Sequence, residues 1–159
     1  TLSTLLSCVA CNGEDNSGPK EATFTHESGI SITLDESFKE SEYESYTVCF
    51  ESENILILVL KEPFTLTDGL EDYTLIKYAG LLREANTKHS PTAISTDDGL
   101  TSFEYGYFNK DQNVTYKYYT TAFKGSDAFW TVQFACKAEE YDALKSTFIE
   151  YAKTVKVTD

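Results

Sequence analysis

The chain of 159 residues is strongly acidic, because 26 aspartates and glutamates outnumber 13 lysines and arginines and give a net charge of −13. A charge of this sign repels phosphate backbones and no basic patch interrupts it, so the composition argues against nucleic-acid binding. With 41% hydrophobic and 14% aromatic residues, the chain can bury a core and is expected to fold as one globular domain.

The first ten residues are uncharged and mostly apolar, and a polar stretch follows directly after Cys11. Such a segment is typical of the end of a secretory signal peptide and is too short to span a bilayer. Leu5-Leu6-Ser7-Cys8 resembles a bacterial lipobox, in which a small residue precedes the cysteine that receives the lipid, and Cys8-Val9-Ala10-Cys11 fits this pattern less closely. We therefore predict a signal-peptide tail over 1–11 with lipid attachment at Cys8 or Cys11, a flexible linker over 12–21, and a globular domain over 22–159.

Other interpretations of the Cys8–Cys11 pair stay open. A redox CxxC pair needs a following helix in a βαβ unit, whereas a linker of Gly, Asn, Ser and Pro follows here. A zinc site needs a second pair, but Cys49 and Cys136 are single cysteines in predicted strands. The pair could also belong to an ordinary N-terminal helical turn. Cys49 and Cys136 themselves are compatible with either a disulfide or two half-buried thiols.

The first half of the domain reads mainly as strands. Alternating apolar residues predict a hairpin, with strands over 22–26 and 30–34 around a turn at Glu27-Ser28-Gly29. Residues 35–44 are charged and irregular, with one helical turn expected around Phe38. A strand over 46–50 follows, and the continuous apolar run 55–60 predicts a central strand that is buried on both faces.

Two helices and a meander complete the expected fold. Asp68, with Glu71 three residues later, is typical of a helix N-cap and predicts a helix that ends near Asn86. Apolar residues at intervals of three and four predict a second helix over 138–153. Between them, residues 92–136 read as a meander of four strands with turns at 97–99, 109–113 and 124–127. The sequence therefore predicts an α+β fold in which a mainly antiparallel sheet of six or seven strands is covered by two main helices.

This order of elements resembles a known family. The matching stretches are Gly29 to Leu34, the Leu70–Leu82 helix, Gly106-Tyr107 through Tyr118, and Phe129 to Phe134 ahead of Phe148. Together they resemble the PsbP/Mog1-type α/β/α sandwich, a fold that recurs in small bacterial lipoproteins. The resemblance covers 22–157 and implies the fold alone, because members of this family share no catalytic set.

No motif for catalysis or cofactor binding is recognisable. The sequence contains no P-loop, dinucleotide-binding, serine-hydrolase or HExxH motif. His26 and His89 both stand beside turn residues, and Asp97-Asp98-Gly99 is typical of a turn and lacks the ligand pattern of a calcium loop. We therefore expect no catalytic site, no metal and no cofactor.

The one suggestive constellation is a group of tyrosines from two adjacent predicted strands: Tyr105, Tyr107, Tyr116, Tyr118 and Tyr119. These rings could pack across the strands beneath the helices, which is the usual role of aromatic residues in a sheet. Alternatively, they could line a groove for a peptide, a glycan or a hydrophobic ligand. The acidic stretch 36–53 is a second candidate surface, for a basic partner.

The leading hypothesis is a non-catalytic extracytoplasmic lipoprotein domain, lipid-anchored to the bacterial cell membrane, that binds a protein partner or a small ligand. One alternative is an enzyme with its site in a groove between the sheet and the 70–86 helix. Another is an accessory subunit of a cell-envelope complex.

Overall fold

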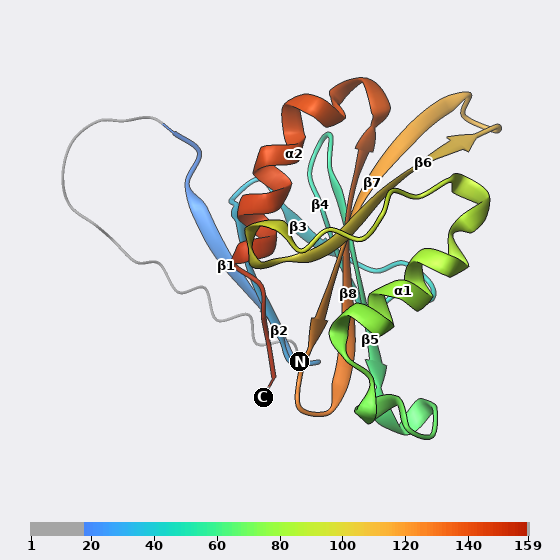
Figure 1. The fold of residues 1–159 in the computed structure, drawn as a ribbon. Helices are drawn as coiled ribbons and strands as arrows, with labels where there is room; N and C mark the ends of the chain where they lie inside the picture. Colours follow the sequence, from blue (N-terminus) through green and yellow to red (C-terminus); the bar gives the residue numbers. More distant parts are fainter. Residues whose placement is uncertain (1–17, 159) are drawn as a thin grey trace.

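The computed structural model describes residues 18–158, so the predicted lipid attachment sites Cys8 and Cys11 lie outside the described part. Its centre is a six-stranded antiparallel sheet (Figure 1). The strands follow the spatial order β3 (Lys39–Ser41), β4 (Val48–Glu51), β5 (Leu56–Pro63), β8 (Ala128–Lys137), β7 (Val114–Lys124) and β6 (Thr101–Asn109). The sheet thus consists of two three-stranded meanders, which are joined where β5 pairs with β8.

A helix and a small second sheet cover one side of this central sheet (Figure 1). The helix is α2 (Ala138–Lys153), and the small sheet has the order β1 (Glu21–His26), β2 (Ile30–Asp35) and β9 (Lys156–Val157). Helix α1 (Leu75–Ala85) lies on the other side. The α+β sandwich expected from the sequence is therefore confirmed, as are the hairpin after residue 20 and the helix over 138–153.

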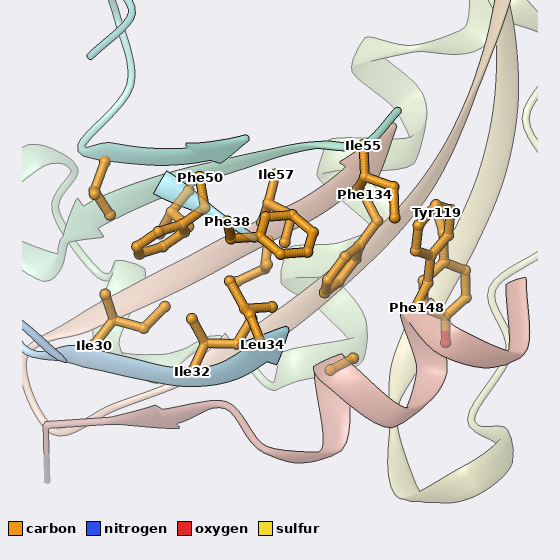
Figure 2. Packing of buried hydrophobic residues seen from close by; sticks show 14 of the residues in the cluster. Ile30, Ile32, Leu34, Phe38, Phe50, Ile55, Ile57, Tyr119, Phe134 and Phe148 are labelled. Carbon is orange, nitrogen blue, oxygen red and sulfur yellow. The ribbon is translucent and has the colours of Figure 1, made fainter. Parts of the chain in front are cut away.

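The main core fills the space between the central sheet and the layer of α2 and β2 (Figure 2). Its residues follow the period of two in each strand, so that Ile30, Ile32 and Leu34 of β2 all face Ile57 and Phe134 of the central sheet. Phe148 of α2 stacks on Phe134 at 5.5 Å between ring centroids. Because these side chains are fully buried, this layer supplies most of the hydrophobic stabilisation of the domain.

The short strand β9 is an edge strand of the small sheet, and Thr158, which follows it, contacts Gly29 in the turn of the first hairpin. Thr158 donates its backbone N–H to the carbonyl of Gly29 at 2.8 Å, and its hydroxyl donates to the same oxygen at 2.9 Å. Gly29 has φ +110°, and a side chain there would collide with Thr158. Glycine is therefore required at the turn of the first hairpin, both for its backbone conformation and for the approach of β9.

The start of α1 differs from the prediction. The helix begins at Leu75, and its N-cap is Thr74, whose hydroxyl accepts from the N–H of Lys77 at 3.2 Å. Asp68 is not the cap, because Gly69 adopts a left-handed conformation with φ 79° and the following residues Leu70–Asp72 form only a single 3-10 turn. Tyr73 is then extended, so the turn and the helix cannot be continuous.

The predicted meander has three strands instead of four. Residues 92–96 pair with β6 at two separate points: Thr92 donates its backbone N–H to the carbonyl of Glu104 at 2.9 Å, and Ser95 forms an isolated bridge with Ser102. At Thr92 the side-chain hydroxyl accepts the N–H of Glu104 at 2.9 Å, taking the place of a backbone carbonyl. The ladder therefore does not extend along this segment.

Two further details of the first half are settled by burial and register. The turn expected around Phe38 is a single hydrogen-bonded turn and not a helix: Phe38 donates its N–H to the carbonyl of Asp35 at 3.1 Å, packs against Tyr151 and leads directly into β3. Cys49 and Cys136 are both free and buried, and the sheet register places them on opposite faces. Burial raises the pKa of each thiol, that of Cys136 to about 11, so neither is a reactive cysteine.

Candidate functional site

The register of β6 and β7 decides which of the predicted tyrosines share a face. Tyr105 lies directly opposite Tyr118, and Tyr107 opposite Tyr116, so these four side chains project from the side of the sheet that carries α1. The rings of Tyr105 and Tyr118 are stacked, with centroids 4.9 Å apart and planes 8° apart. Tyr119 points to the opposite side, where it is buried near Phe134 in the main core.

Helix α1 covers only one end of this face. Tyr78 of α1 stacks on Phe129 at 4.2 Å between centroids, and Ala79 packs into the same small cluster. The helix ends at Ala85 and is followed by the 3-10 turn Thr87–His89, which packs on β6; two hollows remain open on this face. The smaller one, about 240 Å³, is bordered by Leu82 and Asn86 and includes Tyr105.

The larger hollow, about 450 Å³, lies beyond the stacked pair and is lined by Tyr107, Tyr116 and Tyr118. Its floor is formed by Leu56 and Ala135 of the two central strands. We call the two hollows together the tyrosine groove, defined by Tyr43, Tyr46, Tyr105, Tyr107, Tyr116 and Tyr118. Four of the five tyrosines predicted as a ligand surface therefore lie together, and Tyr119 lies apart from them.

The structure adds three residues to this surface that sequence reasoning missed. Tyr43 and Tyr46 border the groove from the connection between β3 and β4, where they are 46% and 38% exposed. His89 stacks on Tyr105 at 5.6 Å and meets Tyr107 edge-on at 5.4 Å. The sequence carries no local signal for these contacts, since each joins segments far apart in the chain.

Hydrogen bonds fix several of the phenol groups in place. Gln133 Nε2 donates to Tyr105 Oη at 2.8 Å, and Tyr116 Oη donates to Gln112 Oε1 at 2.6 Å. Tyr43 Oη donates to a carboxylate oxygen of Glu51 at 2.9 Å. The groove is therefore partly organised before any ligand binds, which lowers the entropic cost of binding.

Two tyrosines of the groove have raised pKa values. Burial raises the pKa of Tyr118 to about 12, and burial also raises the pKa of Tyr105. Both phenols are therefore neutral at physiological pH. A neutral tyrosine offers an apolar ring face and a hydroxyl that can donate or accept, which suits recognition of a ligand.

Carboxylates dominate the charge at the larger hollow. Glu51, Glu53 and Glu140 line it, together with a single cation, Lys137. Side-chain amides of Asn54, Asn109 and Gln112 complete its rim.

A third hollow, about 580 Å³, lies between residues 92–98, β6 and α2. At its base, Tyr141 Oη donates to Glu104 at 2.5 Å and Lys145 Nζ lies 3.1 Å from the same carboxylate. Burial alone would raise the pKa of Glu104, but the hydrogen bonds from Tyr141 and Lys145 and the lysine charges lower it. These contacts attach α2 to β6 and leave the carboxylate satisfied, which is the arrangement of a structural ion pair.

The region between α1 and the sheet contains a second buried polar contact. Tyr78 Oη donates to Glu62 and lies 3.1 Å from the hydroxyl of Thr131. Burial and the Glu62 carboxylate raise the pKa of Tyr78. The contact fastens α1 to the sheet.

Within residues 18–158 no three or more His, Cys, Asp or Glu side chains are grouped to hold a metal ion. None of the helices in this described part is long and apolar enough to cross a membrane.

Comparison with known proteins identifies the fold. The solution structure of cyanobacterial PsbP (CyanoP) from Synechocystis sp. PCC 6803 matches with a TM-score of 0.53, covering 94% of this chain and 98% of that chain. The chain has a PsbP-like fold. The sequence identity is only 11%, so the likeness is one of fold and transfers no residue role. No protein-family model matches the sequence, and no curated protein does. The Mog1 part of the predicted resemblance stays a prediction.

Proposed function

We propose that this PsbP-like protein is a non-catalytic extracytoplasmic lipoprotein domain that binds a protein partner or a small ligand through the tyrosine groove. The observation that carries the proposal is the open end of the sheet beside α1. Six tyrosines border it, and two hollows stay open there beside the 3-10 turn Thr87–His89, whose His89 contacts Tyr105 and Tyr107. A cluster of partly exposed aromatic side chains on a rigid sheet is typical of an interaction surface.

The residue type supports binding over mere packing. The face toward α2 is built mainly from Phe, Val and Ile, whereas the smaller hollow combines leucines with Tyr, Gln, Asn and Thr side chains. Tyrosine provides a large contact area with few rotatable bonds, so ordering it on binding costs little conformational entropy. Tyr107 is already 39% exposed and Tyr43 is 46% exposed, so their contact with water would decrease on binding.

The lipid anchor is the second part of the proposal, and it rests on the lipobox-like sequence before Cys8 and Cys11. The intact mass of the precursor's product, expressed in a bacterium that processes lipoproteins, tests it directly. We expect cleavage and a diacylglyceryl adduct on Cys8 or Cys11. An uncleaved, unmodified chain would show that the anchor, and the extracytoplasmic location with it, is wrong.

The binding part is tested by nuclear magnetic resonance titration of residues 18–158 with a panel of probes: an arginine-containing peptide, a proline-rich peptide, a neutral oligosaccharide and a fatty acid. We expect at least one probe to shift the amide resonances of β6 and β7 around Tyr107 and Tyr116. The variant Tyr107→Ala/Tyr116→Ala should abolish the shifts. Leu66→Ala, which removes an exposed apolar side chain from a turn outside the groove, is the matched control and should bind normally.

The alternative of an accessory subunit in a cell-envelope complex uses the same surface with a permanent partner. The exposed rings of Tyr43, Tyr46 and Tyr107 favour it, because a permanent partner would cover such large side chains. Co-purification from native membranes at a fixed stoichiometry, lost in the Tyr107→Ala/Tyr116→Ala variant, would distinguish it from transient binding.

A further inference from the structure

We infer that the tyrosine groove selects cationic ligands, and that its occupant is an extended, arginine- or lysine-bearing segment of a partner protein. This inference rests on the proposed binding function and specifies the chemistry of the ligand. It is drawn from the charge, the carboxylates without salt bridges and the partly exposed tyrosines at the groove.

The first step concerns the carboxylates. Glu51, Glu53 and Glu140 line the larger hollow, and none of them forms a salt bridge within residues 18–158. Only a few carboxylates of the described chain pair with lysines, as Glu104 does with Lys145 and Asp127 with Lys61. The groove therefore presents acidic groups whose cationic partners are not supplied by the domain.

The chain segment next to the groove adds further negative charge. Residues 36–53, which run from the turn before β3 to the rim of the groove, contain one lysine and six glutamates, namely Glu36, Glu40, Glu42, Glu44, Glu51 and Glu53. A concave surface with one sign of charge concentrates ligands of the opposite sign and speeds their association. It also repels phosphate and sulfate groups, which argues against an anionic lipid or glycan.

The second step concerns the rings. The described chain places lysine ammonium groups over aromatic faces at five positions, including Lys77 over Tyr73 at 3.6 Å and Lys117 over Tyr141 at 4.3 Å. None of these five contacts involves a tyrosine of the groove. Rings beside unpaired carboxylates form a site in which a guanidinium can stack on a face and pair with an oxygen at once.

The third step concerns shape. The stacked pair lies between the two hollows, because Tyr105 lines the smaller and Tyr118 the larger; Leu82 lines the first and Gln112 the second. An elongated site of this kind fits several residues of an extended chain, with side chains entering each hollow. A compact amine would occupy only one of them.

The inference is tested with capped pentapeptides, Gly-Arg-Gly-Arg-Gly and its citrulline and glutamate counterparts, titrated against residues 18–158 by calorimetry and by nuclear magnetic resonance. Citrulline keeps the shape of arginine and removes its charge. We expect the arginine peptide to bind about ten-fold more tightly than the citrulline peptide, to weaken with salt, and to shift groove resonances. The glutamate peptide should not bind.

Matched variants separate the groove from the general negative charge of the protein. Glu51→Gln and Glu71→Gln each remove one charge, but only Glu51 lines the groove. We expect the first to weaken arginine-peptide binding about five-fold and the second to leave it nearly unchanged. Tyr107→Leu keeps an apolar side chain and removes the ring, so it should also weaken binding.

Equal affinity for the arginine and citrulline peptides, or equal effects of the two glutamate variants, would overturn the inference. Binding of the neutral oligosaccharide at the groove without binding of the arginine peptide would also overturn it, while leaving the proposed function intact. If none of the probes shifts groove resonances, both the inference and the binding function fail.

Discussion

The two faces of the central sheet are built from the same strands and differ in what covers them. On the face toward α2, alternate residues such as Trp130, Val132 and Phe134 are fully buried beneath α2 and the small sheet. On the other face, the eleven-residue helix α1 reaches only as far as the middle of the sheet, and the tyrosine groove begins where it stops. Neighbouring residues of one strand thus have different roles: one set is buried in the core, and the other forms a partly solvent-exposed surface.

The largest expected effect lies on the closed face. Phe134→Ala removes a fully buried ring that stacks on Phe148 and packs below β2, and it should lower the free energy of unfolding by about 4 kcal/mol. Urea denaturation followed by circular dichroism measures this change. A loss below about 1 kcal/mol would contradict the assignment of the main core to this face.

The Glu104 ion pair, also on the face toward α2, should contribute less. Glu104→Gln leaves the side chain in place but removes the charge that accepts from Tyr141 and Lys145, so we expect a loss of about 2 kcal/mol at pH 7. The pKa of Glu104 is lowered in the folded state, so its stabilising effect is present above the unfolded value of about 4.3 and is lost as the pH falls through the lower folded value.

Unfolding curves of Glu104→Gln and the wild type should therefore converge in acid. Glu150→Gln serves as the control, because its pair with Lys153 is exposed and should change stability by less than about 0.5 kcal/mol. A gap between wild type and Glu104→Gln that stays constant from pH 7 to pH 3 would rule out the electrostatic explanation.

On the covered half of the α1 face, a smaller effect is expected from Tyr78→Phe. This change keeps the ring on Phe129 and removes the hydroxyl that bonds to Glu62 and Thr131, at a cost of about 1 kcal/mol. Thermal unfolding of Tyr78→Phe, Glu62→Gln and the double variant gives the coupling between the two side chains. Strictly additive effects would show that the hydrogen bond does not fasten α1 to the sheet.

The smallest change in stability is expected at the open half. Tyr107→Ala should alter the free energy of unfolding by less than about 0.5 kcal/mol, because the ring is partly exposed and lies at the outer end of β6. The same denaturation assay measures it. A loss as large as that of Phe134→Ala would mean that the open half is a core surface, and the contrast between the two faces would disappear.

The fold was largely predictable because its strongest signals are local. The alternation in Ile30 to Leu34 and the apolar spacing of α2 follow directly from strand and helix periodicity. The predicted start of α1 was wrong. The left-handed conformation of Gly69 and the extended conformation of Tyr73 prevent a continuous helix from Asp68, although the capping pattern is present there. The predicted strand over 92–96 pairs with β6 only at two separate points, since the hydroxyl of Thr92 and not a carbonyl accepts the N–H of Glu104.

The candidate site was only partly predictable for a related reason. Cross-strand pairing brought together Tyr105, Tyr107, Tyr116 and Tyr118, since parity within two adjacent strands is visible in the sequence. The length of helix that covers a sheet is not visible there, nor are the contacts of Tyr43 and His89, which come from connections outside the meander. A groove depends on what is left uncovered, and that is a property of the assembled tertiary structure.

The junction of the two meanders also bears on how the chain folds. Within each meander the strands are neighbours in sequence, but Leu56 pairs with Ala135 and Pro63 with Ala128, so β5 and β8 meet only by closing a loop of about 70 residues. Local hairpins are expected to form first and this seam to close late, which makes it the step that limits the folding rate. Until then the two most apolar strands have open edges, and a nascent or refolding chain is most prone to aggregation at β5 and β8.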